Sequence, residues 1–410
     1  MKISKDERHT LRELAKRSME LASLPLQAER KARAKDINDL KRRRPIVWLN
    51  EIPWHEMDID GKLVCVCEDA FARGMERHFR QTLYRWEYIQ ADTVVEGWYP
   101  IGKAYSSTGL GVEVKENIIP SDEKNHIVSH GYIDQLDSLE AVAKIKDPVI
   151  KADREQDAKH LEWAADILDG IMDAKLCGNY IYHAPWDTIP RLHGVENVMS
   201  DLIDRPELMH AAVRRFTEAG ISQMRQMEAE GLLGNEKQDV HCTPAYSSET
   251  VPKPETKLKD IWFRGMAQMF SDVSPAMWDE FDLQYMKPLM AECALTYYGC
   301  CESLDKKIPL LKSVPNLRKI GVSPWANPEV CAELIGGGYV YAHKPNPARV
   351  SGAFDAEAVR GEISRVIETC QRHGCPFEFV LKDISTVSYK PGNMIEWVKT
   401  VMGTIDGFYK

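Results

Sequence analysis

Three short runs, Leu295-Thr296-Tyr297-Tyr298, Lys319-Ile320-Gly321-Val322 and Tyr339-Val340-Tyr341-Ala342, give the clearest structural pattern in this chain of 410 residues. Their apolar, β-branched and aromatic residues favour strands, and a longer helical pattern separates each run from the next. Strands that alternate with helices pair in parallel through right-handed crossovers. The repeat therefore indicates an α/β fold.

The same alternation extends over most of the chain and gives eight expected strands. The other five are Ile46–Leu49, Asp92–Glu96, Asn179–His183, Asp239–Cys242 and Phe377–Leu381. Eight strand–helix units favour a closed sheet over an open one, so we expect a single (β/α)8 TIM barrel. Two further runs are expected to be strands outside the barrel, namely Lys62–Cys67 and Gly111–Val114.

A helical extension is expected before the barrel. Residues 5–24 carry leucine and alanine on one face at helical spacing, with charged residues on the other. Pro25 interrupts this pattern, and a second, very polar helical stretch follows to about Leu40. We therefore divide the chain into an N-terminal helical extension, residues 1–44, and a barrel catalytic domain, residues 45–410.

The composition restricts the class of protein. A formal net charge of −9 argues against a general nucleic-acid surface, which needs an excess of positive charge. No apolar run approaches the roughly 18 residues of a membrane-spanning helix, so no membrane partner is expected. The first residues lack the apolar segment of a secretory signal. We therefore expect a cytoplasmic protein whose ten cysteines are reduced thiols.

Residues that follow the strands of a barrel meet at one mouth, where enzymes of this fold carry their chemistry. In this chain those positions hold many tryptophan, histidine and tyrosine residues, which indicate a deep and partly apolar pocket. The expected substrate-binding residues are Trp54, His55, Trp98, Tyr182, Trp186, Tyr246, Trp325, His343, Lys344 and Asn346.

The segment Gly299-Cys300-Cys301-Glu302 is the sharpest local signal. It places two thiols and a carboxylate at a strand-to-helix junction, where the positive end of a helix favours thiolate. Three interpretations stay open at this point. The cysteines are buried core thiols beside a helix-capping Glu302, or one of them is a metal ligand, or one is a reactive nucleophile.

Two other strand ends carry candidate ligands. His241 and Cys242 are either metal ligands or hydrogen-bonding groups in a packed interior. Asp383 follows the last strand and is a ligand, a general base or a partner that holds Lys382. The residues alone do not separate these roles.

Several longer stretches resemble one family of barrel enzymes. They are Arg44-Pro45-Ile46-Val47-Trp48, Arg191-Leu192-His193-Gly194-Val195-Glu196, Ser274-Pro275-Ala276-Met277-Trp278-Asp279-Glu280-Phe281, Tyr298-Gly299-Cys300-Cys301-Glu302, Val322-Ser323-Pro324-Trp325-Ala326 and Lys344-Pro345-Asn346-Pro347. The chain resembles the uroporphyrinogen decarboxylase superfamily, in the branch related to corrinoid-dependent methyltransferases. This resemblance covers nearly the whole chain and implies the barrel more specifically than it implies a reaction.

Two departures from the family pattern bear on the reaction. The decarboxylases carry an arginine-containing Gln-Ala-Gly-Arg loop after the first strand, whereas this chain has an acidic, aromatic loop from Leu49 to Glu56. Such a loop is poorly suited to a polycarboxylate like uroporphyrinogen. Zinc methyltransferases with a thiol acceptor carry His-X-Cys after the fifth strand and another Cys after the last. Tyr298-Gly299-Cys300 and Lys382-Asp383 stand at those places here, so harder ligands replace softer ones.

The resemblance therefore implies an enzyme that moves a methyl group from a small donor, such as an aryl methyl ether, to a corrinoid carried on a partner protein. Such a demethylase component belongs to anaerobic metabolism. A zinc ion would polarise the leaving atom. Its expected ligands are Glu302, Asp383, one of Cys300 and Cys301, and His241. The expected catalytic residues are Glu302, Asp383 and His183, and a homodimer stays open.

Two other functions stay open. The first is a metal-free lyase or decarboxylase that acts on a non-porphyrin substrate, with Asp383 or His183 as the acid–base group. The second is a non-catalytic protein that binds and delivers a tetrapyrrole.

Overall fold

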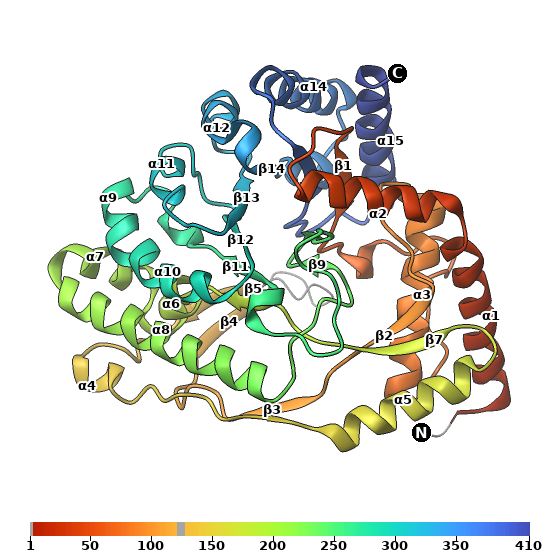
Figure 1. Ribbon diagram of the computed structural model, residues 1–410, viewed down its shortest axis with the longest axis horizontal. Coiled ribbons are helices and arrows are strands. Elements are labelled where there is room, and N and C mark those ends of the chain that lie inside the picture. Colours follow the sequence, from red (N-terminus) through yellow and green to blue (C-terminus); the bar gives the residue numbers. More distant parts are fainter. Residues whose placement is uncertain (1–2, 121–127) are drawn as a thin grey trace.

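A seven-stranded parallel sheet forms the centre of the molecule in the computed structural model, which describes residues 3–120 and 128–410 (Figure 1). Its strands, in spatial order, are β1 (Ile46–Leu49), β15 (Phe377–Leu381), β14 (Val340–His343), β13 (Leu317–Val322), β12 (Leu295–Tyr298), β11 (Trp262–Gly265) and β8 (Ile181–His183). The first and last strands of the chain pair with each other, with Ile46 opposite Glu378. This connectivity is that of a barrel-like α/β fold.

The sheet is not closed, because no strand of the described residues joins β1 to β8. The expected strand Asp92–Glu96 would lie in this opening, and that prediction is wrong. The Asp92 carboxylate accepts a hydrogen bond from the Val47 backbone at 2.9 Å and pairs with Arg33 at 2.7 Å. The backbone N–H of Asp92 also donates to the Val47 carbonyl, at 3.0 Å, but the chain does not continue along β1 as a strand.

The fourth barrel strand is β11, so the assignment of Asp239–Cys242 to that place is wrong. Residues Asp239–Val240 form β9, which pairs antiparallel with β10 (Thr243–Pro244). The side chain of Arg264 lies in the middle of β11 and is fully buried, with its guanidinium carbon 4.2 Å from the centre of the Tyr297 ring. An arginine inside an apolar run concealed the strand from the hydrophobic pattern.

The two runs expected outside the barrel are not strands either. Lys62–Cys67 forms turns and extended chain, and Gly111–Val114 is irregular. Around the first run, the Glu76 carboxylate accepts hydrogen bonds from the backbone N–H groups of Val66 and Cys67. A carboxylate thus takes the place of a neighbouring strand.

A large insertion lies between Asp92 and β8 and packs on the N-terminal helices. Its strands are β2 (Trp98–Gly102), β3 (Tyr105–Ser107), β4 (Glu116–Pro120), β5 (Val128–Tyr132), β6 (Ile150–Ala152) and β7 (Asp173–Cys177). They pair two by two, as β2 with β7, β3 with β6 and β4 with β5. Helices α1 (Lys5–Ala22), α3 (Ala70–Tyr88) and α5 (Arg154–Leu168) share a separate apolar cluster with β2.

The expected helical extension is confirmed, because α1 and α2 (Pro25–Asn38) occupy it. Ser4 caps α1 through its side chain, and Pro25 occupies the first position of α2, where a missing N–H costs nothing. The division into an extension and one barrel domain stays a prediction.

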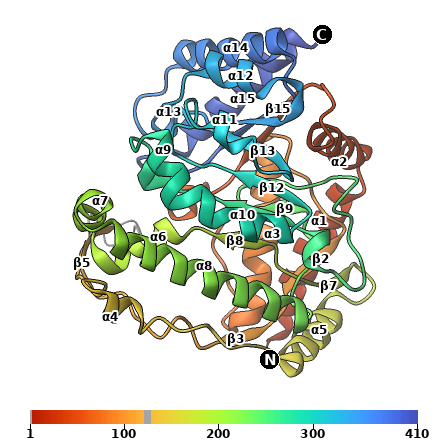
Figure 2. The ribbon, with the colours of Figure 1, turned by 60° about the vertical axis from the view of Figure 1, so that its left-hand side comes forward.

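Helices cover the outside of the sheet, and Figure 2 shows the 24-residue helix α8 (Pro206–Ala229) beside β8 and α10 (Gln284–Glu292). The others are α4 (Leu139–Val142), α6 (Pro185–His193), α7 (Val195–Asp204), α9 (Pro275–Trp278), α10 (Gln284–Glu292), α11 (Ile308–Leu311), α12 (Pro328–Ile335), α13 (Ala348–Ser351), α14 (Ala356–His373) and α15 (Pro391–Phe408). Among the described residues, no helix has the length and apolar content needed to cross a bilayer.

A buried ion pair holds the inside of the sheet together. Lys319 of β13 and Glu378 of β15 are both completely shielded from solvent, and Lys319 Nζ lies 2.8 Å from Glu378 Oε1. Thr243 of β10 donates to the same carboxylate at 2.6 Å, and Lys319 also donates to the carbonyl of Pro244. The β9–β10 hairpin is thereby fixed inside the sheet.

Glu378→Gln should lower the free energy of unfolding by about 3 kcal/mol, because it leaves the buried Lys319 without its counter-charge. Urea denaturation measures this loss. Glu396→Gln is the matched control, since Glu396 pairs with Lys399 at the surface and its loss should cost under about 0.5 kcal/mol. Equal losses in the two variants would contradict a structural role for the buried pair.

Candidate functional site

Two thiols and a carboxylate meet at the carboxyl ends of β12 and β15. Cys300 and Cys301 follow β12, and their sulfur atoms are 3.7 Å apart. Asp383 follows β15, and its Oδ2 accepts a hydrogen bond from the Cys301 thiol at 2.8 Å. One ligand atom from each of the three residues lies within 4.8 Å of the other two. We call these three residues the thiol cluster.

A buried ammonium and a second carboxylate border the thiol cluster. Lys382 Nζ lies 3.1 Å from Cys300 Sγ and 2.6 Å from Asp383 Oδ1. Glu51, after β1, accepts a hydrogen bond from the Asp383 backbone at 2.9 Å and lies 3.5 Å from Lys382 Nζ. Three strand ends, those of β1, β12 and β15, therefore converge on one charged centre.

The backbone around the thiol cluster adopts rare conformations. Glu51, His241 and Asp383 are non-glycine residues with positive φ angles of 51°, 56° and 56°. Such residues persist only where the surroundings fix them, and they gather at functional sites. Gly299 has a φ of 99°, and a Cβ there would lie 2.4 Å from Leu304, so glycine permits the turn that presents Cys300.

The charge around the cluster favours a thiolate at Cys300. Hydrogen bonding from Cys301 lowers the pKa of Cys300, and His241, Arg264 and Lys382 add to this effect against burial. The pKa of Cys301 is raised by its hydrogen bond to Cys300, by burial and by the charge of Asp383. Cys301 therefore keeps its proton between two anions, while Cys300 carries negative charge.

Two further cations, Arg264 and Lys344, are buried inside the sheet near the thiol cluster. Arg264 has no exposed surface and makes no ion pair with a carboxylate in the described parts of the chain. Lys344 Nζ lies 3.6 Å from the sulfur of Cys242. Burial opposes the charge of Lys382, but the charges of Cys300, Cys242 and Asp383 outweigh it and raise the Lys382 pKa. The inside of the sheet is thus arranged to stabilise anions.

His241 forms one side of the site. Its ring stacks on Tyr182 with 5.8 Å between ring centres, and its carbonyl accepts a hydrogen bond from Asn50, just after β1. Tyr182 donates to the carboxylate of Asp187 at 2.9 Å. Burial raises the pKa of both Tyr182 and Asp187, which keeps a proton on this pair.

Glu302 lies apart from the thiol cluster although it was expected among the metal ligands. Its side chain is buried, with Oε1 accepting from the backbone of Ala267 at 3.1 Å and Oε2 from that of Cys300 at 2.8 Å. Both oxygens are therefore occupied by main-chain groups. In this structure Glu302 positions the loops after β11 and β12.

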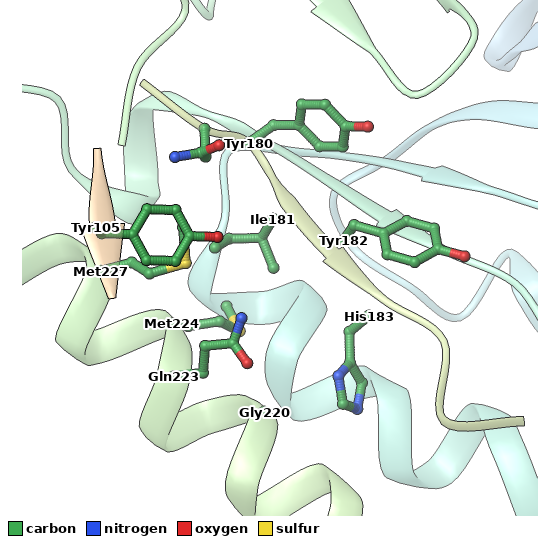
Figure 3. A pocket seen from close by; sticks show the side chains of 10 residues that line it. Tyr105, Tyr180, Ile181, Tyr182, His183, Gly220, Gln223, Met224 and Met227 are labelled. Carbon is green, nitrogen blue, oxygen red and sulfur yellow. The ribbon is translucent and has the colours of Figure 1, made fainter. Parts of the chain in front are cut away.

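His183 lies on the face of β8 that packs against α8 (Figure 3), and it is not among the residues that meet in the thiol cluster. Along this strand Ile181 and His183 point toward α8, whereas Tyr180 and Tyr182 point away from it. The ring fits there because position 220 is glycine, where a Cβ would lie 2.6 Å from the imidazole. Burial lowers the pKa of His183 to about 4. It lines a cavity of about 320 Å³ between β8 and α8.

Three other residues that were expected in the pocket make contacts elsewhere in the fold. Trp186 is 1% exposed and donates from Nε1 to the Phe281 carbonyl at 3.1 Å in the core. Trp98 lies in the insertion, on β2, beneath the ammonium of Lys175. Tyr246 donates to Glu96 at 2.9 Å, away from the strand ends. Trp98 and Tyr246 were placed at the mouth through the two wrong strand assignments.

The remaining expected residues surround the mouth without joining the thiol cluster. Trp54 packs edge-on against Tyr84, His55 lies edge-on to Tyr389, and Trp325 is 68% exposed. Lys344 faces the inside of the sheet, as described above. His343 and Asn346 line a separate cavity behind β13 and β14.

Arg264 is the site residue that the sequence pattern missed, because its strand was not recognised. The run Trp262-Phe263-Arg264-Gly265 is the signal that could have found it, since two large apolar residues indicate a buried strand and a strand glycine often marks a place where a ligand or another backbone approaches closely. Cys300, Cys301, Asp383 and His241 were expected at the mouth, and the structure brings them together.

Comparison with known proteins supports the fold. No protein-family model matches the chain. No curated protein matches it either. Among solved structures, a methyltransferase from Methanosarcina mazei is 13% identical, with a TM-score of 0.52 over 93% of this chain and 99% of its own. RipC from Yersinia pestis is 12% identical over 53% of this chain and 94% of its own, and its TM-score of 0.22 carries no argument. The first likeness establishes a shared fold.

The ultraviolet absorbance of thiolate should show a titration step well below about pH 8.5, the ordinary pKa of cysteine. Cys300→Ser should reduce the step by the share of Cys300 and leave that of Cys375, whose pKa is also lowered by its hydrogen bond with Cys370. Lys382→Met should move the Cys300 share up by about 1–3 pH units, because a cation beside the sulfur is lost. Cys65→Ser is the control, since burial raises the pKa of Cys65 and it contributes nothing in this range. An unchanged step in Cys300→Ser would disprove the assignment.

Proposed function

We propose that the protein is a methyltransferase that moves a methyl group from a small donor, an aryl methyl ether, to a corrinoid carried on a partner protein. The thiol cluster is the observation that carries this proposal. Its three residues stand at strand ends of a fold shared with a methyltransferase over nearly the whole chain. The resemblance in sequence supplies the corrinoid and the donor class.

The donor atoms of the thiol cluster suit a zinc ion. Cys300, Cys301 and Asp383 offer two sulfur ligands and one oxygen ligand, a set that zinc accepts. Three protein ligands leave a fourth position open, as in catalytic zinc sites, where the ion acts as a Lewis acid toward a leaving atom. Lys382 Nζ now neutralises two of these ligands, so its ammonium must move aside when a cation binds.

Residues around the thiol cluster are suited to protonate and stabilise the ether oxygen that leaves the methyl donor. In the proposed transfer, a Co(I) corrinoid would supply the electron pair for the new bond to the methyl carbon. The ether oxygen would leave with the electron pair of the broken C–O bond and would need a proton. The Tyr182–Asp187 pair shares a hydrogen bond, and the charge of nearby Cys300 contributes to the raised pKa of both residues. We assign the protonation of the leaving oxygen to this pair. Arg264 and Lys382 stabilise the negative charge that develops.

A second candidate function is a metal-free lyase. Lys382 already balances the charges of Cys300 and Asp383 without a metal, which favours an acid–base site. The Cys301 thiol, which donates to Asp383, would then be the proton carrier. His183, the other acid–base candidate, faces α8 and does not take part.

Metal content separates the two candidates. Purified protein offered zinc should hold about one equivalent by elemental analysis, as expected for a single site. Cys300→Ser, Cys301→Ser and Asp383→Asn should each reduce zinc affinity by at least about tenfold, because each removes a ligand. Cys65→Ser should retain the metal, since Cys65 lies outside the thiol cluster. A protein that takes up no zinc would exclude the metal-assisted reaction and leave the lyase.

Methyl transfer is then tested with a Co(I) corrinoid protein and a panel of methyl ethers and methylamines, following methyl-cobalt absorbance. We expect formation with at least one ether. Asp187→Asn should lower the rate by about 10²–10⁴-fold while zinc content stays unchanged, because it removes the proton source. The absence of methyl-cobalt with every donor, in protein shown to hold zinc, would refute the proposed reaction.

A further inference from the structure

A second cavity, of about 420 Å³, lies behind the carboxyl ends of β13 and β14. Helix α14 forms its outer wall. Its polar lining consists of Ser323, His343, Asn346, Arg349, Glu362 and Arg365. Side chains of neighbouring residues alternate across a strand end, so Lys344 reaches Cys242 inside the sheet while His343 reaches this cavity. The sheet therefore separates the cavity from the thiol cluster.

Three buried polar atoms at the cavity lack hydrogen bonds to any described residue. They are the hydroxyl oxygen of Ser323 and both ring nitrogens of His343. Ser323 is 1% exposed and His343 is 5% exposed. His343 Nε2 lies 3.7 Å from Glu362 Oε1, which is too long for a hydrogen bond. Unpaired buried polar groups are costly and uncommon, so their gathering at one cavity indicates a ligand.

The charge of the lining specifies the class of ligand. Glu362 pairs with Arg349, whose Nε lies 3.4 Å from Oε2, and it also accepts from the Asn346 backbone at 3.1 Å. Arg365 makes no ion pair in the described parts of the chain. The cavity thus keeps an excess positive charge in a protein whose formal net charge is −9.

We propose that this cavity binds the oxyanion group, carboxylate or phosphate, of a small molecule. Arg365 supplies the unmatched positive charge, and the Ser323 hydroxyl and the His343 imidazole donate hydrogen bonds. Arg349 stays oriented by Glu362 and completes the polar wall. The volume is sufficient for a small organic anion. This inference does not rest on the reaction proposed for the thiol cluster.

Isothermal titration calorimetry with inorganic phosphate and with succinate tests the proposal and distinguishes the two kinds of oxyanion. We expect one equivalent of at least one anion to bind. Arg365→Gln should weaken this binding by at least about tenfold, because it removes a charge-assisted contact. His343→Gln, which removes the imidazole donor, should weaken it in the same direction.

Two control variants locate the binding. Arg372→Gln removes the same charge from the same helix but lies beside Glu329, outside the cavity, so it should leave affinity unchanged. Lys382→Met removes the cation beside the thiol cluster and should also leave the affinity of the cavity for the anion unchanged. The proposal is overturned if neither anion binds, if Arg365→Gln binds as tightly as Arg372→Gln, or if only Lys382→Met abolishes binding. Thermal melting of each variant verifies that it is folded.

Discussion

The buried contact between Lys319 and Glu378 is the interaction on which the interior depends. Two unpaired charges inside a sheet would be too costly to keep, and together they satisfy each other. Their shared partner, Thr243, fixes the β9–β10 hairpin, whose neighbouring residues His241 and Cys242 reach toward the thiol cluster. The Lys319–Glu378 pair, inside the sheet, therefore fixes the position of residues at the site although it takes no part in the proposed chemistry.

The sequence predicted those strands whose burial shows as an apolar run. β1, β12, β13, β14 and β15 are of this kind, and each of them, like the less apolar β8, lies at or within two residues of its expected place. β11 was missed because Arg264 interrupts its apolar run. The strand can bury this arginine because the guanidinium lies over the ring of Tyr297, a contact that the sequence does not reveal. The expected strand after β1 did not form because pairing with β1 stops at Asp92, whose backbone N–H and carboxylate both bond to Val47. Contacts of this kind, between residues far apart in the sequence, leave no periodic pattern of apolar residues.

For the site, the rule that strand ends converge was sufficient to bring together Cys300, Cys301, Asp383 and His241. It could not give the direction of a side chain, which reverses with each residue along a strand. His183 and Trp186 therefore belong to helix contacts and the core, and Glu302 points at backbone N–H groups. Only a three-dimensional packing arrangement settles which side of the sheet each one faces.

The opening between β1 and β8 has a consequence for how this pocket can change. The hairpin segment 239–246 stands beside both edges, touching Asn50 on one and Tyr182 on the other, yet its contacts to them run through side chains. Most barrel walls are bound to their neighbours by a ladder of main-chain hydrogen bonds, so their residues are hard to insert or delete. This wall of the pocket is held instead by a few side-chain contacts, through Asn50, Tyr182 and Thr243. Exchange of one of these side chains could therefore shift the wall and reshape the pocket while the seven-stranded sheet stays intact.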